Sequence, residues 1–470
     1  MIPAAFALAG ALGLAGLLTR PERPLRLASL LLTAGGTLAV LGWLGVVHTL
    51  RAHVAVAAAG LAVALVVGLV AARALQRRPL ALPFAACAAA PFRFPVHLGS
   101  QDANLLVPLY AVIGVAFLAL LLDSLRSSRP VRLPPRRFAV PLLLFVAWEA
   151  VSLAWSASAT EGAKAIGFYA LPFGVLLAAL VAHPPPVPRL ADLLRLQVVL
   201  ALAFAAVGVY QVLTHDVWWN RKLMVSNAFS SFFRANSIFY DPSIFGRYLA
   251  VTITLVFAAL LFGVVRRPLL AGVAAGLAWI GILTSYSQSA FVALCAAVGA
   301  GLILAFGRRL AALLLVAAAL VGLAIVAVPS VRHSGVNRVT SERSQLVGDG
   351  LRLFRAHPLA GVGLGGSTDA ARQQTARGRA VRRAQHVMPL TVASELGIVG
   401  LVLVAWLLTV LARLALAEGD RRPERLALGL GLLAILVHSL FYAAFFEDPL
   451  TWGLAALLVA CAAPGIIEDA

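Results

Sequence analysis

The stretch RAHPLAGVGLGGSTDAARQQTARGRAVRRAQHVMPLTVASELGIVG, residues 355–400, begins as a polar island rich in glycine and arginine within an otherwise apolar chain. Ten arginines lie within residues 332–383, and the island closes on His386. The apolar run that follows carries Glu395 and the sequence GIVG at residues 397–400. We expect the island to be a large loop between membrane spans, for which the rest of the chain is the scaffold.

Composition assigns the chain to a class before any motif is considered. Over 470 residues, 61% are hydrophobic, 12% are charged and the mean hydropathy is +0.94. These values exclude a water-soluble globular protein and predict a polytopic membrane protein. Cys87, Cys295 and Cys461 are an odd number of cysteines and all lie in apolar runs, so we expect neither disulfides nor a metal site.

The net charge of +19 comes almost wholly from arginine, because Lys164 and Lys222 are the only lysines. Much of this charge lies between apolar runs, where membrane proteins keep positive loops on the cytoplasmic side. Nucleic-acid binding is the weaker explanation of the charge, and we expect no nucleic-acid partner.

Apolar runs of about 17 to 25 residues are long enough to cross a hydrocarbon core of about 30 Å as helices. Thirteen to fifteen such runs predict an all-α fold, a polytopic transmembrane helical bundle. The first run has no basic segment before it and no small-residue cleavage site after it, so we interpret it as a retained helix. Residues 80–92 are short and contain prolines, which suits either a short crossing or a re-entrant element.

Loop composition divides the chain into four predicted parts. These are N-terminal helices at 1–195, central helices with an arginine-bearing outer loop at 196–328, a large loop at 329–388, and C-terminal helices at 389–470. Arginine-rich segments at 126–137 and 418–425 predict cytoplasmic turns, which place the large loop on the opposite, outer side of the membrane.

Polar and aromatic residues fill a second outer segment, residues 215–243. Asp241 precedes Pro242, a pattern typical of a helix N-cap. Arg247 lies about one turn inside the following apolar run, where an unpaired guanidinium is costly, so it either serves a site or extends to the interface. A further outer turn, TSYSQSA at residues 284–290, is rich in hydroxyl groups that commonly cap helices.

These motifs resemble the O-antigen ligase and O-antigen polymerase family. RAHPLAGVGLGG resembles the family's "PlxGvGxG" loop segment, and His386 followed after ten residues by GIVG resembles its H[NSQ]x9GxxG signature. Arg343 lies where the family has a loop arginine, and the hydrophobic pattern agrees over residues 196–460. Two positions depart from the family: Val387 replaces a polar residue, and Gln288 stands where members commonly have arginine.

The resemblance implies a metal-independent glycosyltransferase of the inner membrane that uses no cofactor. Such enzymes move a glycan from undecaprenyl pyrophosphate to a sugar hydroxyl of a glycan or glycolipid acceptor at the outer face of the bilayer. The reaction needs a base near the hydroxyl, a role that suits His386, and fixed positive charge for the departing pyrophosphate. Arginine forks match phosphate oxygens, so the expected catalytic set adds Arg343, Arg247 and Arg234.

Six further positions are expected to contact substrate: Gln288, Tyr286, Asp241, Gly363, Gly365 and Glu395. For Glu395, hydrogen bonding within the helix bundle is the favoured role over that of a base. A transporter or lipid-linked glycan flippase is the main alternative, although the sequence contains no internal repeat of the kind found in many transporters. A structural partner without catalysis would leave the arginine, glycine and histidine series unexplained. The sequence does not distinguish a ligase from a polymerase.

Overall fold

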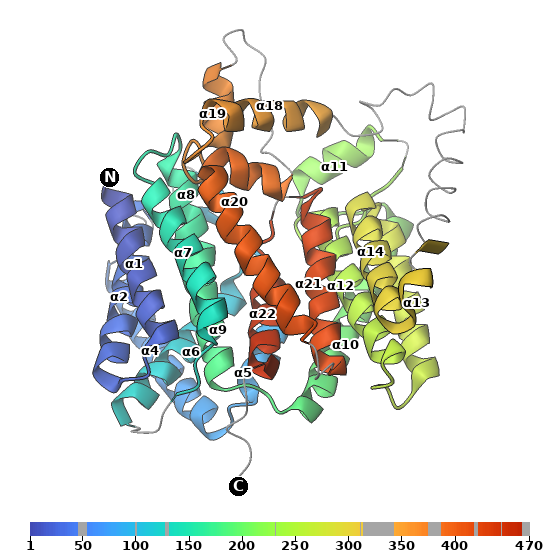
Figure 1. Cartoon of the computed structure of the whole chain (residues 1–470), viewed down its shortest axis with the longest axis horizontal. Helices are drawn as coiled ribbons and strands as arrows, with labels where there is room; N and C mark the ends of the chain where they lie inside the picture. The colour runs from blue at the N-terminus through green and yellow to red at the C-terminus, as the bar shows by residue number, and fades with distance from the viewer. Residues whose placement is uncertain are drawn as a thin grey trace.

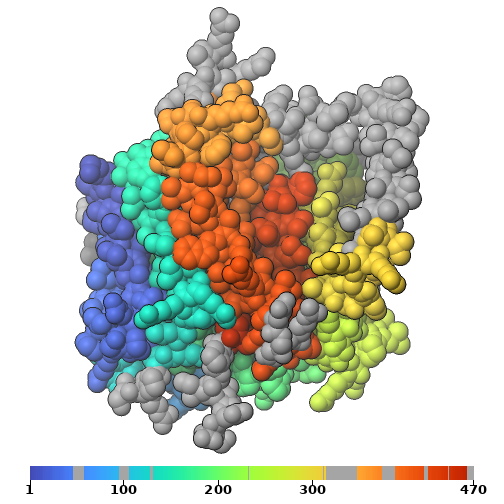
Figure 2. All heavy atoms as spheres, in the orientation of Figure 1, coloured from blue at the N-terminus to red at the C-terminus, as the bar shows by residue number. Residues whose placement is uncertain are grey.

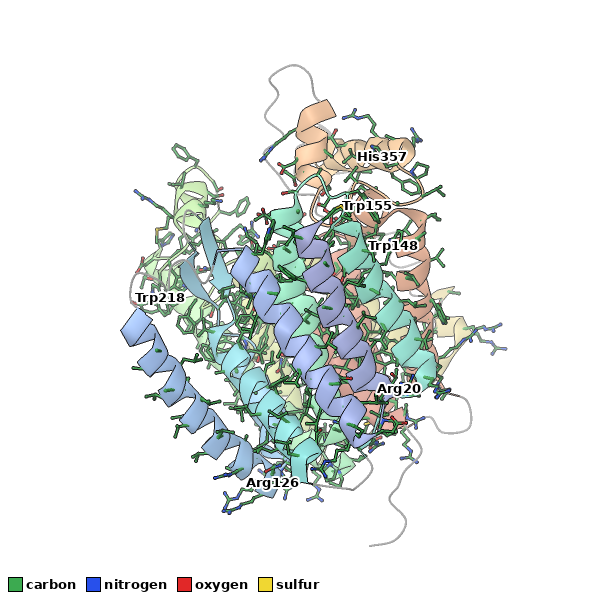
Figure 3. The ribbon with its side chains drawn as sticks, turned by 90° about the vertical axis from the view of Figure 1, so that its left-hand side faces the viewer. Arg20, Arg126, Trp148, Trp155, Trp218 and His357 are labelled. Carbon is green, nitrogen blue, oxygen red and sulfur yellow. The ribbon has the colours of Figure 1, made fainter. Side chains whose placement is uncertain are left out.

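The computed structural model describes residues 1–45, 54–98, 101–126, 131–230, 232–310, 312–313, 343–374, 387–417, 422–442 and 444–462. Long helices run between two ends of the molecule (Figure 1). We call one the loop end, because it carries the short helices α11 (Arg221–Ala228), α18 (Arg343–Ala356) and α19 (Ser367–Gln374). The other is the arginine end, where Arg20 and Arg126 lie far from His357 of the loop end (Figure 3). This arrangement agrees with the predicted separation of arginine turns from the large loop.

The first third of the chain forms one side of the bundle. Its elements are α1 (Ile2–Thr19), α2 (Arg23–Trp43), α4 (Val54–Arg77), α5 (Ala81–Ala89), the antiparallel strands β1 (Phe94–Leu98) and β2 (Gln101–Leu105), and α6 (Val107–Arg126). Helices α1 and α2 approach so closely that a Cβ at Gly13 would overlap the backbone of Thr33, and one at Gly36 would overlap that of Gly10. Small residues at such contacts are the usual means of packing helices in membranes.

The next helices complete that side and lead across the molecule. They are α7 (Arg136–Ser152), α8 (Ala159–Ala165), a π-helical turn η1 (Ile166–Ala170), α9 (Leu171–Ala182) and α10 (Val187–Thr214). A second hydrophobic cluster joins α10 to α12 (Pro242–Leu261), α13 (Pro268–Ser285) and α14 (Gln288–Phe306). Two packed groups of helices therefore stand side by side (Figure 1).

Three C-terminal helices lie between the two groups: α20 (Met388–Ala415), α21 (Pro423–Ser439) and α22 (Pro449–Ala462). Helix α20 packs on α7, and α21 packs on α12 and α14. Figure 2 shows the orange residues of α18 to α20 covering the loop end beside the blue-green α7 and α8 segment. The C-terminal helices thus connect both groups to the loop end.

Ten helices of the described residues are long and apolar enough to cross a membrane. Helices α7 and α21, with 17 residues each, and the 14-residue α22 stand among them in the bundle. The predicted all-α polytopic bundle is confirmed, and a two-stranded hairpin is its one small addition among these residues. Nearly all of the predicted span at residues 310–328 lies outside the described residues.

The short run at residues 80–92 forms a helix that is too short to cross the membrane. Helix α5 has nine residues, and at 1.5 Å per residue it reaches only about 14 Å, less than half of a hydrocarbon core. The chain then continues into the β1–β2 hairpin before α6. This segment is therefore a half-length helix followed by extended chain rather than a full helical span.

Candidate functional site

The glycine-rich motif and the GIVG motif bind each other. Gly397 has φ 67° and interrupts α20, so the backbone there can bond outside its own helix. The N–H of Ile398 donates to the carbonyl of Pro358 at 2.8 Å, and the N–H of Val362 donates to that of Ser394 at 2.9 Å. A Cβ at Gly397 would overlap the carbonyl of Leu359, so only glycine suits this position. We call residues 358–367 and 394–398 the glycine clasp.

Glu395 holds the two parts of the clasp together through hydrogen bonds of its side chain. Its carboxylate accepts hydrogen bonds from the N–H of Gly365 at 2.8 Å and from the hydroxyl of Ser367 at 2.6 Å. It also accepts from the N–H of Ser367 at 3.4 Å, at the start of α19. Glu395 is only 7% exposed. This is the structural role that the sequence favoured for it over that of a base.

The clasp also binds the turn between α7 and α8. The hydroxyl of Ser156 donates to the carbonyl of Leu364 at 2.7 Å, and the indole N–H of Trp148 donates to the carbonyl of Leu396 at 3.0 Å. Gly363 and Gly365 have φ 85° and 74°, and a Cβ at either would overlap backbone of this turn or of α8. Both glycines therefore hold the loop end together, and their predicted contact with substrate stays a prediction.

Arg247 of α12 is 1% exposed and forms an ion pair with Asp448, the Nη2 to Oδ2 distance being 2.6 Å. Its Nη1 donates to the carbonyl of Ala444 at 3.4 Å, and its guanidinium carbon lies 5.9 Å from the centre of the Tyr442 ring. The guanidinium is thus enclosed by the α21–α22 turn rather than extended to the interface. Its Nε is buried without a hydrogen-bond partner among the described residues, which is unusual for a native side chain.

Arg234 lies in the segment between α11 and α12, and its Nε donates to the carbonyl of Ser285 at 3.3 Å. Its backbone is fixed by the side chain of Asn227, which bonds to both its N–H and its carbonyl. Gly246, the neighbour of Arg247, packs closely on Ser285 and Ser287. The segments that carry the two arginines therefore meet at the α13–α14 turn.

The remaining predicted contacts lie around this turn. Asp241 caps α12 by accepting the N–H of Ser243 at 2.6 Å, as the N-cap pattern predicted. Tyr286 and Gln288 are both exposed, and the Tyr286 ring stacks on Phe232 at 4.8 Å. Substrate binding by these three side chains stays a prediction.

Two residues of the predicted catalytic set cannot be placed fully. His386 lies outside the described residues, and for Arg343 the description covers the backbone at the first turn of α18 but not the side chain. Their convergence with Arg247 and Arg234 is therefore still a prediction.

Sequence reasoning missed three residues at this end: Asp448, Glu447 and Glu149. The acidic pair in FFEDP was visible between two apolar runs, but its partner Arg247 lies two hundred positions earlier. Glu149 lies in a run that was counted only as a span. A carboxylate inside an apolar run is the signal that could have identified it, because such groups are expensive in membranes.

A cavity of about 1220 Å³ lies between the two helix groups. Its walls come from α5, α9, α10, α12, α13, α21 and α22, and they are mostly aliphatic. Arg195, Arg266 and Arg267 line it at the arginine end, while Pro449 and Leu450, next to Asp448, line it at the start of α22. Its size exceeds the usual range for small-molecule pockets, about 300 to 1,000 Å³, and suits a long lipid chain.

The many apolar helices and the polar site at one end define a multi-pass membrane protein with a candidate active site. Residues 273–405 match the family model described as O-antigen ligase. No curated protein matches the chain. The matched segment contains the glycine clasp and the α13–α14 turn, and the match supports membership of the O-antigen ligase and O-antigen polymerase family. This match supports an O-antigen ligase-type membrane glycosyltransferase, the class that the sequence motifs predicted.

Proposed function

We propose that this protein transfers a glycan from undecaprenyl pyrophosphate to a sugar hydroxyl of an acceptor at the outer face of the inner membrane. The observation that carries the proposal is the position of Arg247. Its buried guanidinium has an unsatisfied Nε, and its partner Asp448 adjoins two residues that line the large apolar cavity. A cation beside a lipid-sized apolar space matches a donor that joins a pyrophosphate to a long polyprenyl chain.

In this proposal the polyprenyl chain occupies the cavity and the pyrophosphate approaches Arg247. A guanidinium has five N–H donors, so Arg247 can bind Asp448 and still donate to phosphate oxygens. Arg234 and Arg343 add further positive charge. Such fixed charge stabilises the leaving group as the glycosidic bond to phosphate breaks.

His386 is the proposed general base. It removes the proton from the acceptor hydroxyl as the oxygen attacks the anomeric carbon of the donor glycan, and undecaprenyl pyrophosphate leaves. The clasp supports this role indirectly, because it fixes the start of α20 directly after His386. No metal is required in this scheme, since arginines supply the positive charge.

Incubation of the purified protein with a lipid-linked oligosaccharide and a candidate acceptor tests the proposal. A ladder of products would indicate a polymerase, and a single transfer would indicate a ligase. Unchanged donor and acceptor across a panel of acceptors would contradict it.

A further inference from the structure

Two exposed aromatic rings stack on each other at the α13–α14 turn. The centres of the Phe232 and Tyr286 rings are 4.8 Å apart, and the ring planes differ by 25°. Phe232 is 44% exposed and Tyr286 is 56% exposed, so each ring turns one face toward the other and keeps accessible surface. We call these two rings the aromatic platform.

The backbone next to each ring is fixed by hydrogen bonds between the two segments. The N–H of Ala235 donates to the carbonyl of Thr284 at 3.0 Å, and the Nε of Arg234 donates to that of Ser285 at 3.3 Å. Tyr286 ends α13 with φ 49°. A positive φ is uncommon for a residue other than glycine and persists only where the surrounding structure imposes it. The rings are therefore ordered before a ligand arrives, which lowers the entropy cost of binding.

The platform lies beside both arginines that are proposed to bind pyrophosphate. Arg234 follows Phe232 by two positions. A Cβ added at Gly246, the residue before Arg247, would lie 2.8 Å from the Cβ of Ser287, so the α13–α14 turn packs directly on this part of α12. In the proposed function the pyrophosphate approaches these guanidinium groups. The first sugar of the donor is joined to the pyrophosphate, so it lies near the turn.

The surroundings of the rings suit a sugar better than a lipid chain. A pyranose ring offers C–H groups that pack on aromatic faces, and hydroxyl groups that require hydrogen bonds. Gln288 begins α14 two positions after Tyr286, and its side chain is exposed. The side-chain amide forms no hydrogen bond within the described part of the chain. It can both donate to and accept from hydroxyl groups, whereas an acyl chain has no partner for it.

We propose that the aromatic platform binds the first sugar of the donor glycan, the one joined to the pyrophosphate. One face of the pyranose ring packs on the platform, and a hydroxyl group bonds to the Gln288 amide. This inference rests on the proposed function and adds a glycan subsite to the donor site. Selection among donors then depends on their first sugar, since the platform contacts neither the polyprenyl chain nor the pyrophosphate.

Equilibrium binding of two radiolabelled probes to the purified protein tests the inference. One probe is lipid-linked oligosaccharide from cells that lack this protein, and the other is undecaprenyl pyrophosphate without a glycan. Tyr286→Leu should weaken binding of the first probe about threefold to tenfold, the usual effect of losing one aromatic contact. It should change binding of the second probe less than twofold.

Two further variants and a control separate the ring from the fold of the turn. Phe232→Leu leaves the end of α13 intact and should have the same selective effect as Tyr286→Leu. Tyr286→Phe should retain most of the affinity for the oligosaccharide probe, since it keeps the ring. Phe229→Leu is the matched control, because Phe229 is 89% exposed at the end of α11 and lies outside the platform. It should bind both probes as the wild type does.

Equal weakening of both probes in Tyr286→Leu would overturn the inference, because rings that contact the carrier or the bilayer do not distinguish the two. Unchanged binding of both probes would overturn it as well. Glycan transfer by the same proteins separates the inference from the proposed function. Selective loss of oligosaccharide binding in Tyr286→Leu, with no transfer even by the wild type, would support the platform and contradict the proposed reaction. Transfer by Tyr286→Leu with wild-type rate and donor affinity would contradict the platform alone.

Discussion

Replacement of Arg247 by alanine should abolish transfer, and a second replacement can show why. Alone, Arg247→Ala leaves Asp448 buried, at 4% exposure, without its cation. Breaking a buried ion pair in this way typically costs about 3 to 5 kcal/mol of stability. A loss of activity in the single variant could therefore come from a damaged fold or from a damaged site, and the single variant does not distinguish the two.

The double variant Arg247→Ala with Asp448→Ala removes the unpaired charge as well. We expect it to recover the part of the stability that the unpaired carboxylate costs, because no buried charge is then left without a partner. Transfer should remain about 10² to 10³ below wild type, the usual cost of losing one donor to a charged transition state. Arg247→Lys should retain part of the activity, since it keeps the charge and loses the fork.

Two measurements on each purified variant decide the matter: thermal unfolding in detergent and the initial rate of glycan transfer. If Arg247 only holds the α21–α22 turn, activity should return together with stability in the double variant. Wild-type transfer by that variant would refute the assignment of Arg247 to the pyrophosphate.

Three further predictions concern the base, the clasp and the cavity. His386→Ala should insert normally, as judged by its amount in membranes, and lose about 10² to 10⁴ in transfer rate; near-normal transfer would return His386 to a structural role. Gly363→Ala should lower the unfolding temperature because its Cβ would overlap backbone, whereas Gly348→Ala, which has open space, should not; equal effects would count against the clasp. Gly453→Leu should raise the KM for a donor with a full-length polyprenyl chain more than for a short-chain analogue, since Gly453 lines the cavity. Gly276→Leu, also in open space but away from the cavity, is its control; a similar rise in Gly276→Leu would remove the cavity from the account.

The sequence predicted the class of fold well, because span length and arginine placement follow from the physics of the bilayer. It also placed Arg234 and Arg247 in one expected catalytic set; the structure brings their segments to the α13–α14 turn, and a shared site stays a prediction. The N-cap role of Asp241 followed from local pattern alone. Local and compositional signals were sufficient in each case.

Contacts between distant segments were beyond the sequence. The apolar period of α20 gives no sign that Gly397 breaks the helix to receive residues 358–362. The partner of Arg247 lies in the turn after α21, so an interface position and a buried pair were equally compatible with the pattern. Phe145 and Phe446 become neighbours only when α7 and the α21–α22 turn meet. These contacts depend on how helices pack, which periodicity does not specify.

The most direct test of the central claim is the balance between glycan transferred and lipid carrier released. Purified protein in proteoliposomes is given a doubly labelled donor, with one label in the glycan and one in the undecaprenyl pyrophosphate, together with the acceptor glycolipid. Our account predicts that each transferred glycan is matched by one released undecaprenyl pyrophosphate. Movement of intact donor across the bilayer, with both labels still joined and no product formed, would contradict it and indicate a flippase.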